Sequence, residues 1–506
     1  MIIGFVIGES KPTSVTAQTS RPLAVGEYVV IDSKNKLLGL AEKTIVSSAA
    51  LADVHNYDEA VESKEIADIN SRDKSFTTKI MILGFLSGLK KGNVVIPSIP
   101  PFPGTQILEA TKYDLEDVFN PANSSWAKIG TLLRNPKIEL KININKIVTR
   151  HFGILAMTGM GKSNLIAIIA KEIAKLNGTL IIFDYHNDYN NLNIKKMNIM
   201  DAKINPRLLD SSTLADILEI RENADVQQRI LRLAFTQNVK ESKEFWNELY
   251  KQVEFVGANP ERKEDRHSAD RVCDKIDDAR HRFSDILDPD IIDPISLIKE
   301  FRINILNISG FSEKQANVVV AYYLQELLLD KKLSTIVNNS KKKHRKFRFS
   351  SPVFVIIEEA HVFIPKFEDT HAKYWASKIA REGRKFGLGI GIVSQRPRNI
   401  DSNVLSQIGS FAIMKIIQED DQRQIAYAVE SISKDLISQL TSLNVGDAIL
   451  VGQCVNLPTL IHIHEAKEKI TGSDPDAVGE WKKMTRFNEA IKDAQELINK
   501  DLLFSQ

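Results

Sequence analysis

Two short segments of this chain could together bind and cleave a nucleoside triphosphate. The first runs from Ala156 to Ser163 with the sequence AMTGMGKS, between an apolar stretch and a helical pattern. Backbone N–H groups in a glycine loop at a helix N-terminus surround phosphate oxygens. Lys162 would neutralise the β- and γ-phosphates, and the Ser163 hydroxyl would bind Mg²⁺. We expect ATP to be bound by the loop and the residue after it, namely Thr158, Gly159, Met160, Gly161, Lys162, Ser163 and Asn164.

Two acids at the end of a second apolar stretch could supply the carboxylates that triphosphate cleavage needs. Glu358 and Glu359 follow the strand-like run from Val353 to Ile357. In a nucleotidase the first acid holds Mg²⁺ through water, and the second polarises the attacking water. Adjacent residues on a strand point to opposite faces, so the two carboxylates cannot do the same work. The alternative is a solvated strand end without chemistry.

Three further polar residues could touch a nucleotide. Gln395 follows the apolar run from Gly389 to Val393, and its amide could sense the γ-phosphate or hold the lytic water. An exposed residue at the start of a turn is the alternative. Arg381 lies near a predicted helix end, where cations are favoured in any case, but it could also be an arginine finger given to a neighbouring subunit's phosphate. Arg150, just before the loop strand, is a second candidate for a nucleotide or interface contact.

Other charged segments give less specific signals. The acids and His186 of the segment from Asp184 to Tyr189 are placed at the carboxyl edge of the predicted sheet, where ligands bind in such folds. They could orient water or couple hydrolysis to DNA, and a loop that satisfies its own backbone is an equal alternative. The basic run from Lys341 to Arg348 could contact phosphates, although most such runs are solvated loops. Lys366 and Lys373 lead away from the acid pair and are better candidates for a loop that grips DNA.

The elements around these motifs change character along the chain. Residues 1–125 carry short apolar runs separated by turn residues, which predicts a small barrel or sandwich. We interpret Pro97 to Gly104 as a stiff exit connection and 113–140 as a small helical element or linker. From about residue 140 a strand, a helix and a strand follow one another, which predicts a parallel α/β sheet. Residues 206–300 are charged and helical in pattern, which predicts an insertion packed on the core.

The bulk composition is that of a soluble globular protein. Of the 506 residues, 43% are hydrophobic and 26% are charged, and no apolar run reaches the ~18 residues of a membrane helix. The N-terminus has no basic region of a signal peptide, so we expect no membrane segment and a cytoplasmic location. Only two cysteines are present, which argues against a disulfide framework or a structural zinc site. The net charge is only +2, so a polyanion would have to be bound by a local basic patch.

The chain resembles the HerA family of archaeal DNA translocases, in the FtsK–HerA group of P-loop ATPases. The matching features are the β-rich N-terminus and the segments Met157 to Asn164, Ile357 to His361, Ala380 to Gly387 and Ser394 to Pro397. The Glu-Ala-His continuation and the Arg-Glu-Gly-Arg-Lys block are more specific than either nucleotide motif alone.

The resemblance implies a fold, an assembly and a set of partners. The fold is α/β, with a RecA-like P-loop ATPase core at 126–470 interrupted by the helical insertion at 206–300. An N-terminal β-barrel of the HAS type occupies 1–125, and a helical tail occupies 471–506. The family implies a homohexameric ring with double-stranded DNA in its pore. The implied partner is the NurA nuclease, in DNA end resection alongside Mre11 and Rad50.

The resemblance also assigns roles by position. It implies that Lys162 and Ser163 bind phosphate and Mg²⁺, that Glu358 assists the metal and that Glu359 activates water. Gln395 would sense the nucleotide, and Arg381 would be the arginine that acts in trans. Ala156 stands where the family pattern has glycine, and Glu358 stands where Asp is more usual, so the loop and metal geometry stay open. Two other functions also stay open: a rotary- or secretion-type ATPase that moves protein, and an inactive ring scaffold.

Overall fold

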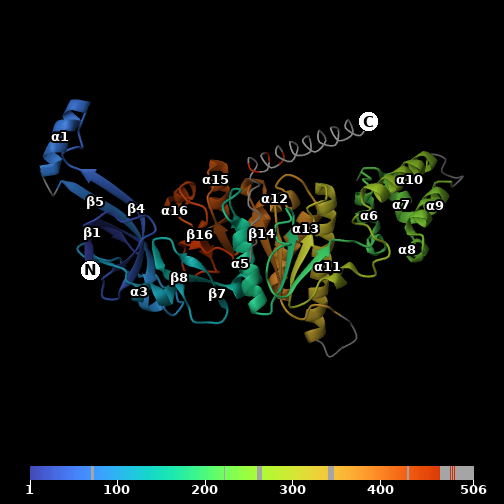
Figure 1. Cartoon of the computed structure of the whole chain (residues 1–506), viewed down its shortest axis with the longest axis horizontal. Coiled ribbons are helices and arrows are strands. Elements are labelled where there is room, and N and C mark those ends of the chain that lie inside the picture. The colour runs from blue at the N-terminus through green and yellow to red at the C-terminus, as the bar shows by residue number, and fades with distance from the viewer. Residues whose placement is uncertain are drawn as a thin grey trace, which may run out of the picture.

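The computed structural model describes residues 1–69, 73–221, 223–258, 265–339, 347–429 and 432–467, together with residues 479, 481 and 484. Three parts follow one another along the longest axis of the molecule: a β-barrel, a large α/β unit and a group of helices (Figure 1). Apart from those three positions, the predicted tail at 471–506 lies outside the described residues. So do Lys341 to Lys346 of the basic run.

The N-terminal part is a closed barrel of six strands, as predicted. Every second residue of its second strand is buried, and inward side chains such as Val6, Ala17 and Ile80 form a core separate from the main one. The strands close in the order β1-β2-β5-β4-β3-β6. Their bounds are Ile2–Lys11, Ser14–Thr19, Tyr28–Ile31, Leu37–Ser48, Lys74–Phe85 and Gln106–Glu109 for β1 to β6.

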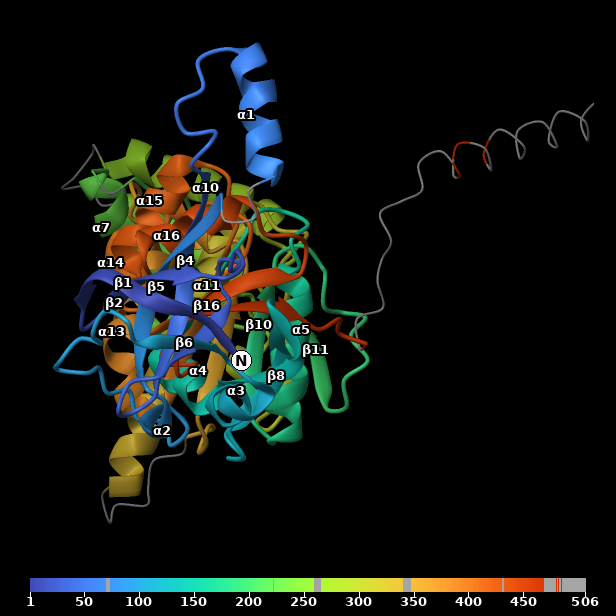
Figure 2. The ribbon, with the colours of Figure 1, turned by 90° about the vertical axis from the view of Figure 1, so that its left-hand side faces the viewer.

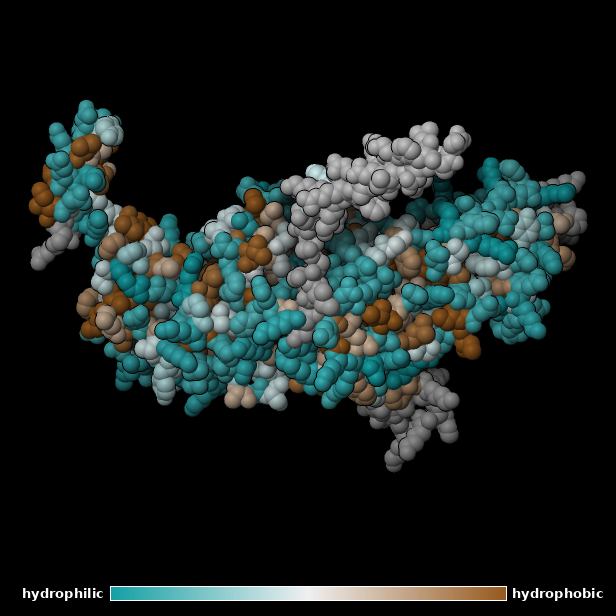
Figure 3. Space-filling view, viewed as in Figure 1, coloured by the Kyte–Doolittle hydropathy of each residue, from teal (hydrophilic) through white to brown (hydrophobic). Residues whose placement is uncertain are grey.

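Two connections of the barrel differ from simple turns. The helix α1 (Tyr57–Ile69) joins β4 to β5 and projects away from the barrel (Figures 1 and 2), with apolar side chains on its surface (Figure 3). The segment from Pro97 to Gly104 was predicted to leave the barrel, and this prediction is wrong. After it, β6 returns and pairs with both β1 and β3, so this segment precedes the closing strand.

The interval 113–140 is a second correction, because only its first part is the predicted small helix and strands follow. The helix α3 (Lys112–Phe119) has the capping box of Thr111 and Asp114, but it is followed by β7 (Trp126–Leu132) and β8 (Asn135–Asn143). These two strands pair with each other, and β7 pairs with β17, so the hairpin extends the large sheet.

The large sheet has eleven strands in the order β11-β12-β10-β13-β14-β9-β15-β16-β17-β7-β8. From β11 to β15 neighbouring strands are parallel, as the strand–helix–strand pattern predicted. The remaining pairs are antiparallel. The bounds of β9 to β17 are Phe152–Leu155, Thr179–Asp184, Met197–Asp201, Ile303–Asn307, Val353–Ile357, Leu388–Ser394, Ser410–Ile413, Asp447–Gly452 and Thr459–Ile463.

Helices flank this sheet and form the third part of the molecule. In the predicted insertion, α7, α9 and α10 pack on one another at the end opposite the barrel (Figure 1). Among the described residues, no helix combines the length and apolar composition needed to cross a bilayer. The insertion helices α6 to α10 are Ser211–Ile217, Asp225–Ala234, Gln237–Glu241, Phe245–Gly257 and Asp265–Arg282. The core helices α4 and α5 are Ile144–Arg150 and Lys162–Lys175, and α11 to α16 are Glu313–Asn339, Ala360–Phe363, His371–Glu382, Ser402–Ser406, Glu419–Ala428 and Lys434–Ser438.

Candidate active site

The glycine loop leaves the carboxyl end of β9, and α5 begins at Lys162. Gly159 and Gly161 have φ values of 78° and 105°, a left-handed backbone that favours glycine. A Cβ at Gly159 would meet no atom within 4 Å, so the space above the loop is open to a ligand. Ala156 is buried and has no positive φ, which explains why alanine is accepted at the first position of the motif.

Lys162 lies back over its own loop and close to the acid pair. Its Nζ donates to the carbonyl oxygens of Ala156 at 3.3 Å and Met157 at 3.2 Å. Burial lowers the pKa of Lys162, whereas the carboxylates of Glu359 and Glu358 raise it. The lysine and both acids, nearly two hundred residues apart in sequence, therefore belong to one electrostatic cluster.

Glu358 is a buried acid whose two oxygens both have donors. Oε1 accepts from the Tyr189 hydroxyl at 2.5 Å, and Oε2 accepts from the Tyr185 backbone N–H at 3.3 Å. Burial raises the pKa of Glu358 to about 8, and the neighbouring Asp184 and Asp188 add to this increase. Both donors come from the segment after β10, so the carboxyl edge of the sheet holds this acid in place.

Glu359 has a left-handed backbone with φ of 43°, which is rare for a residue with a side chain. Such strain is maintained where the surroundings fix a functional group. Its Oε1 lies 3.1 Å from Nε2 of His186. Its Oε2 lies 3.2 Å from Nδ1 of His361, but this oxygen is buried and makes no hydrogen bond within the described part of the chain.

Gln395 connects the acid pair to the loop. It follows β14, which lies between β13 and β9 in the sheet. The Thr158 hydroxyl of the loop donates to Oε1 of Gln395. Because the three strands are parallel and neighbouring, their carboxyl ends bring the acids, the amide and the loop together. This is where the sequence prediction placed them.

Three of the residues predicted to contact a nucleotide make other contacts within their own chain. The side-chain amide of Asn164 donates to the carbonyl oxygen of His464 at 2.8 Å and accepts from the N–H of Ala466 at 2.7 Å, so it holds the end of β17. Arg150 lies at the amino end of β9, and its carbonyl oxygen accepts from the Gly409 N–H. Arg381 lies elsewhere again.

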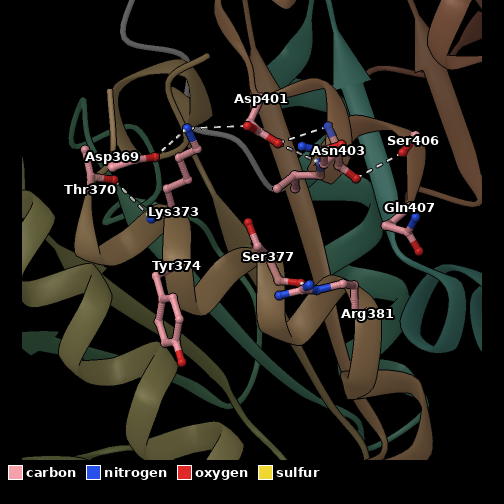
Figure 4. A pocket seen from close by; sticks show the side chains of 11 residues that line it. Asp369, Thr370, Lys373, Tyr374, Ser377, Arg381, Asp401, Asn403, Ser406 and Gln407 are labelled. Carbon is pink, nitrogen blue, oxygen red and sulfur yellow. Dashed lines mark hydrogen bonds and ion pairs between the residues drawn. The ribbon is translucent and has the colours of Figure 1, made fainter. Parts of the chain in front are cut away.

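Arg381 is exposed near the end of α13 and lines a cavity of about 690 Å³ that contains none of the loop residues (Figure 4). Its Nε donates to the carbonyl oxygen of Ser377. On the other side of this cavity Lys373 is paired with Asp369 at 3.1 Å and Asp401 at 3.4 Å, and little of its side chain is exposed. Lys373 is therefore an ion-pair partner within this chain, and its role in gripping DNA stays a prediction.

Comparison with known proteins gives the family. The family described as "Helicase HerA, central domain" matches residues 127–327. The DNA double-strand break repair helicase HerA of Saccharolobus solfataricus is 36% identical over 509 residues, which cover 97% of this chain and 98% of the relative. The chain belongs to the HerA family. The protein of the same name from Sulfolobus acidocaldarius is also 36% identical, over 96% of this chain and 97% of its own length.

A solved structure supports the fold. VirB4 of Thermoanaerobacter pseudethanolicus superimposes with a TM-score of 0.50 at 13% identity, covering 69% of this chain and 99% of that chain. At this identity the likeness shows the fold alone. With membership of the HerA family, the P-loop fold identifies the chain as an ATP-hydrolysing helicase or translocase.

The residues at this HerA-family site fit Mg²⁺ that arrives with a nucleotide. Lys162 feels the carboxylates of Glu359, Glu358 and Asp188, and burial raises the pKa values of Glu358 and of the neighbouring Asp184, so added positive charge would be favourable there. None of the described residues donates a hydrogen bond to the buried Oε2 of Glu359. Within the described residues no cluster of three or more acids, histidines or cysteines forms a complete metal site, and Mg²⁺ typically takes one or two protein ligands plus phosphate oxygens.

Three contacts of the site were not assigned from sequence, namely those of His186, Tyr189 and His361. The first two lie in the segment that was placed at the sheet edge, where a role in orienting water or coupling to DNA was weighed against a structural loop. His361 directly follows the acid pair, and its Nδ1 also lies 3.2 Å from Oγ of Ser394. The sequence signals were the position of the first two after a strand and the Glu-Ala-His continuation for His361. The partner of His186 is 173 residues away and cannot be read from local spacing.

Proposed function

We propose that this protein is an ATP-driven translocase or helicase of double-stranded DNA, which works as a homohexameric ring with DNA in its pore. The observation that carries the proposal is the cluster of Lys162 with Glu358 and Glu359 at one sheet edge, beside the amide of Gln395. The HerA family supports DNA as the substrate, because its relatives are named as DNA repair helicases. Grip on the phosphate backbone implies little sequence preference and strong salt dependence.

Each side chain of the cluster has a proposed task. Lys162 leaves the loop carbonyls and binds the β- and γ-phosphates, while the loop N–H groups surround them. Glu359 accepts a proton from the attacking water, and Gln395 exchanges its bond with Thr158 for the γ-phosphate or the water. Ser163 and Glu358 would hold Mg²⁺, which neutralises charge on the phosphates when bound.

Arg381 is proposed to act in trans. It lies outside the loop cluster of its own chain and is exposed beside a cavity, as a residue offered to a neighbouring subunit must be. An arginine supplied in this way stabilises charge in the transition state and contributes about 10³-fold or more in rate. The active site would then be complete only between two subunits of the ring.

We also propose the cellular context and the division into domains. The protein would work in the cytoplasm with the NurA nuclease, and with Mre11 and Rad50, in resection of DNA ends at double-strand breaks; its relatives carry break repair in their names. The barrel at 1–125 and the core at 126–470, interrupted at 206–300, would be separate domains, since the first strand of the large sheet along the chain begins at Trp126.

The test is the ATPase rate of the purified oligomer with and without duplex DNA, with native mass measured on the same sample. We expect a mass of six subunits and a rate that rises with DNA and falls as salt is added. Duplexes of unrelated sequence should stimulate equally. A rate indifferent to DNA at every salt concentration would overturn the proposal and favour a motor that moves protein.

A further inference from the structure

The two oxygens of the Glu359 carboxylate have different surroundings. Oε1 is 3.1 Å from Nε2 of His186, and since a carboxylate only accepts, this histidine nitrogen carries the proton and donates. Oε2 is buried and lies 3.2 Å from Nδ1 of His361, but it makes no hydrogen bond with the described residues. A general base needs one oxygen free to receive a proton and a second oxygen held so that the first is aimed.

His186 is itself held in place from several sides. Its ring packs edge-on against Tyr185, with centroids 5.2 Å apart, and Tyr185 packs in the same way against Phe363 at 5.8 Å. Below it, Asp184 accepts from the backbone N–H groups of Asp188 and Tyr189, which fixes the turn that carries the histidine. The ring is half exposed and still has one defined partner.

Phe363 lies at the end of α12, the short helix that Glu359 itself precedes. The histidine and the acid are therefore linked in two ways. One is the hydrogen bond between them, and the other is the aromatic contact of Tyr185 with both His186 and Phe363. Rotation of the Glu359 carboxylate would break its hydrogen bond to His186.

We propose that His186 is a positioning residue for ATP hydrolysis, which holds Oε1 of Glu359 so that Oε2 faces the attacking water. The inference rests on the proposed function of Glu359. In the step, the water oxygen forms a bond to the γ-phosphorus, the bond from that phosphorus to the bridging oxygen of ADP breaks, and the water proton passes to Oε2. His186 touches neither water nor phosphate, and it exchanges no proton.

The experiment compares steady-state ATP hydrolysis by the full-length oligomer and by His186→Ala, His186→Gln and the control His281→Ala, an exposed histidine on α10. We expect His186→Ala to lower kcat by about 10- to 100-fold, the usual effect of losing a residue that orients an active group. KM for ATP should change less than about twofold, because no phosphate contact is removed. His186→Gln should recover part of the rate, since its amide can donate to the same oxygen.

The single variant Glu359→Gln, measured alongside, separates this inference from the function on which it rests. It should be inactive, because it removes the carboxylate through which His186 acts. Wild-type kcat in His186→Ala, while Glu359→Gln is inactive, would overturn the positioning role and leave the proposed function standing. An active Glu359→Gln would overturn both. A glutamine variant as slow as the alanine variant would also count against positioning through the hydrogen bond.

Discussion

Replacing Glu358 by glutamine should make the protein less sensitive to alkaline pH in the absence of nucleotide and Mg²⁺. Burial raises the pKa of this acid from 4.5 to about 8. Because the folded-state value is the higher one, the protonated acid favours folding. Its contribution is complete below the ordinary pKa and is lost as pH rises toward 8, by on the order of 5 kcal/mol in total.

The substitution removes this titration and keeps the hydrogen bonds. A glutamine oxygen can accept from the Tyr185 N–H, and its amide can donate to the Tyr189 hydroxyl, which can also accept. The assay is the unfolding midpoint of both proteins in EDTA at pH 5, 7 and 9. The wild-type midpoint should fall toward that of Glu358→Gln, or below it, as pH rises. If the unfolding midpoints of the two proteins change in parallel from pH 5 to 9, ionisation of the buried Glu358 does not destabilise the fold, and the reasoning is refuted.

Two more predictions test the arginine and the core. If Arg381 acts in trans, inactive Arg381→Ala subunits mixed with inactive Glu359→Ala subunits should recover part of the ATPase rate, and no recovery at any mixing ratio would refute this. His151→Ala should lower the free energy of unfolding by about 2–4 kcal/mol, because the neutral ring, whose pKa burial lowers to about 4, donates to Ala380 O and accepts from Ile390 N. An unchanged thermal midpoint would contradict that assignment.

Residues that follow strands were the most predictable part of the site. The acids at 358 and 359 and the amide of Gln395 each follow an apolar run, and parallel strands necessarily align their carboxyl ends. Side chains with two possible uses were not predictable. The sequence cannot show that Asn164 would bond to the backbone at 464 and 466, or that Lys373 would pair with Asp401.

The error in the fold at 113–140 has a different cause. Ile138, Leu140 and Ile142 alternate with exposed or partly exposed residues in β8, which is the period of a half-buried strand. That signal was present in the sequence, but the preceding helical stretch and the absence of a long apolar run concealed it. The hairpin joins the large sheet through β7, whose partner strand β17 lies more than three hundred residues further along the chain. Only the folded structure therefore shows which sheet the hairpin joins.

The most direct test of the whole account is ATP turnover by Lys162→Ala on duplex DNA, with native mass as the control for assembly. The lysine amine donates to two loop carbonyls and is influenced by both acids, and it is the side chain assigned to neutralise the β- and γ-phosphates. We predict that turnover is abolished while the mass of the oligomer is unchanged. Normal turnover by this variant would contradict the proposed site.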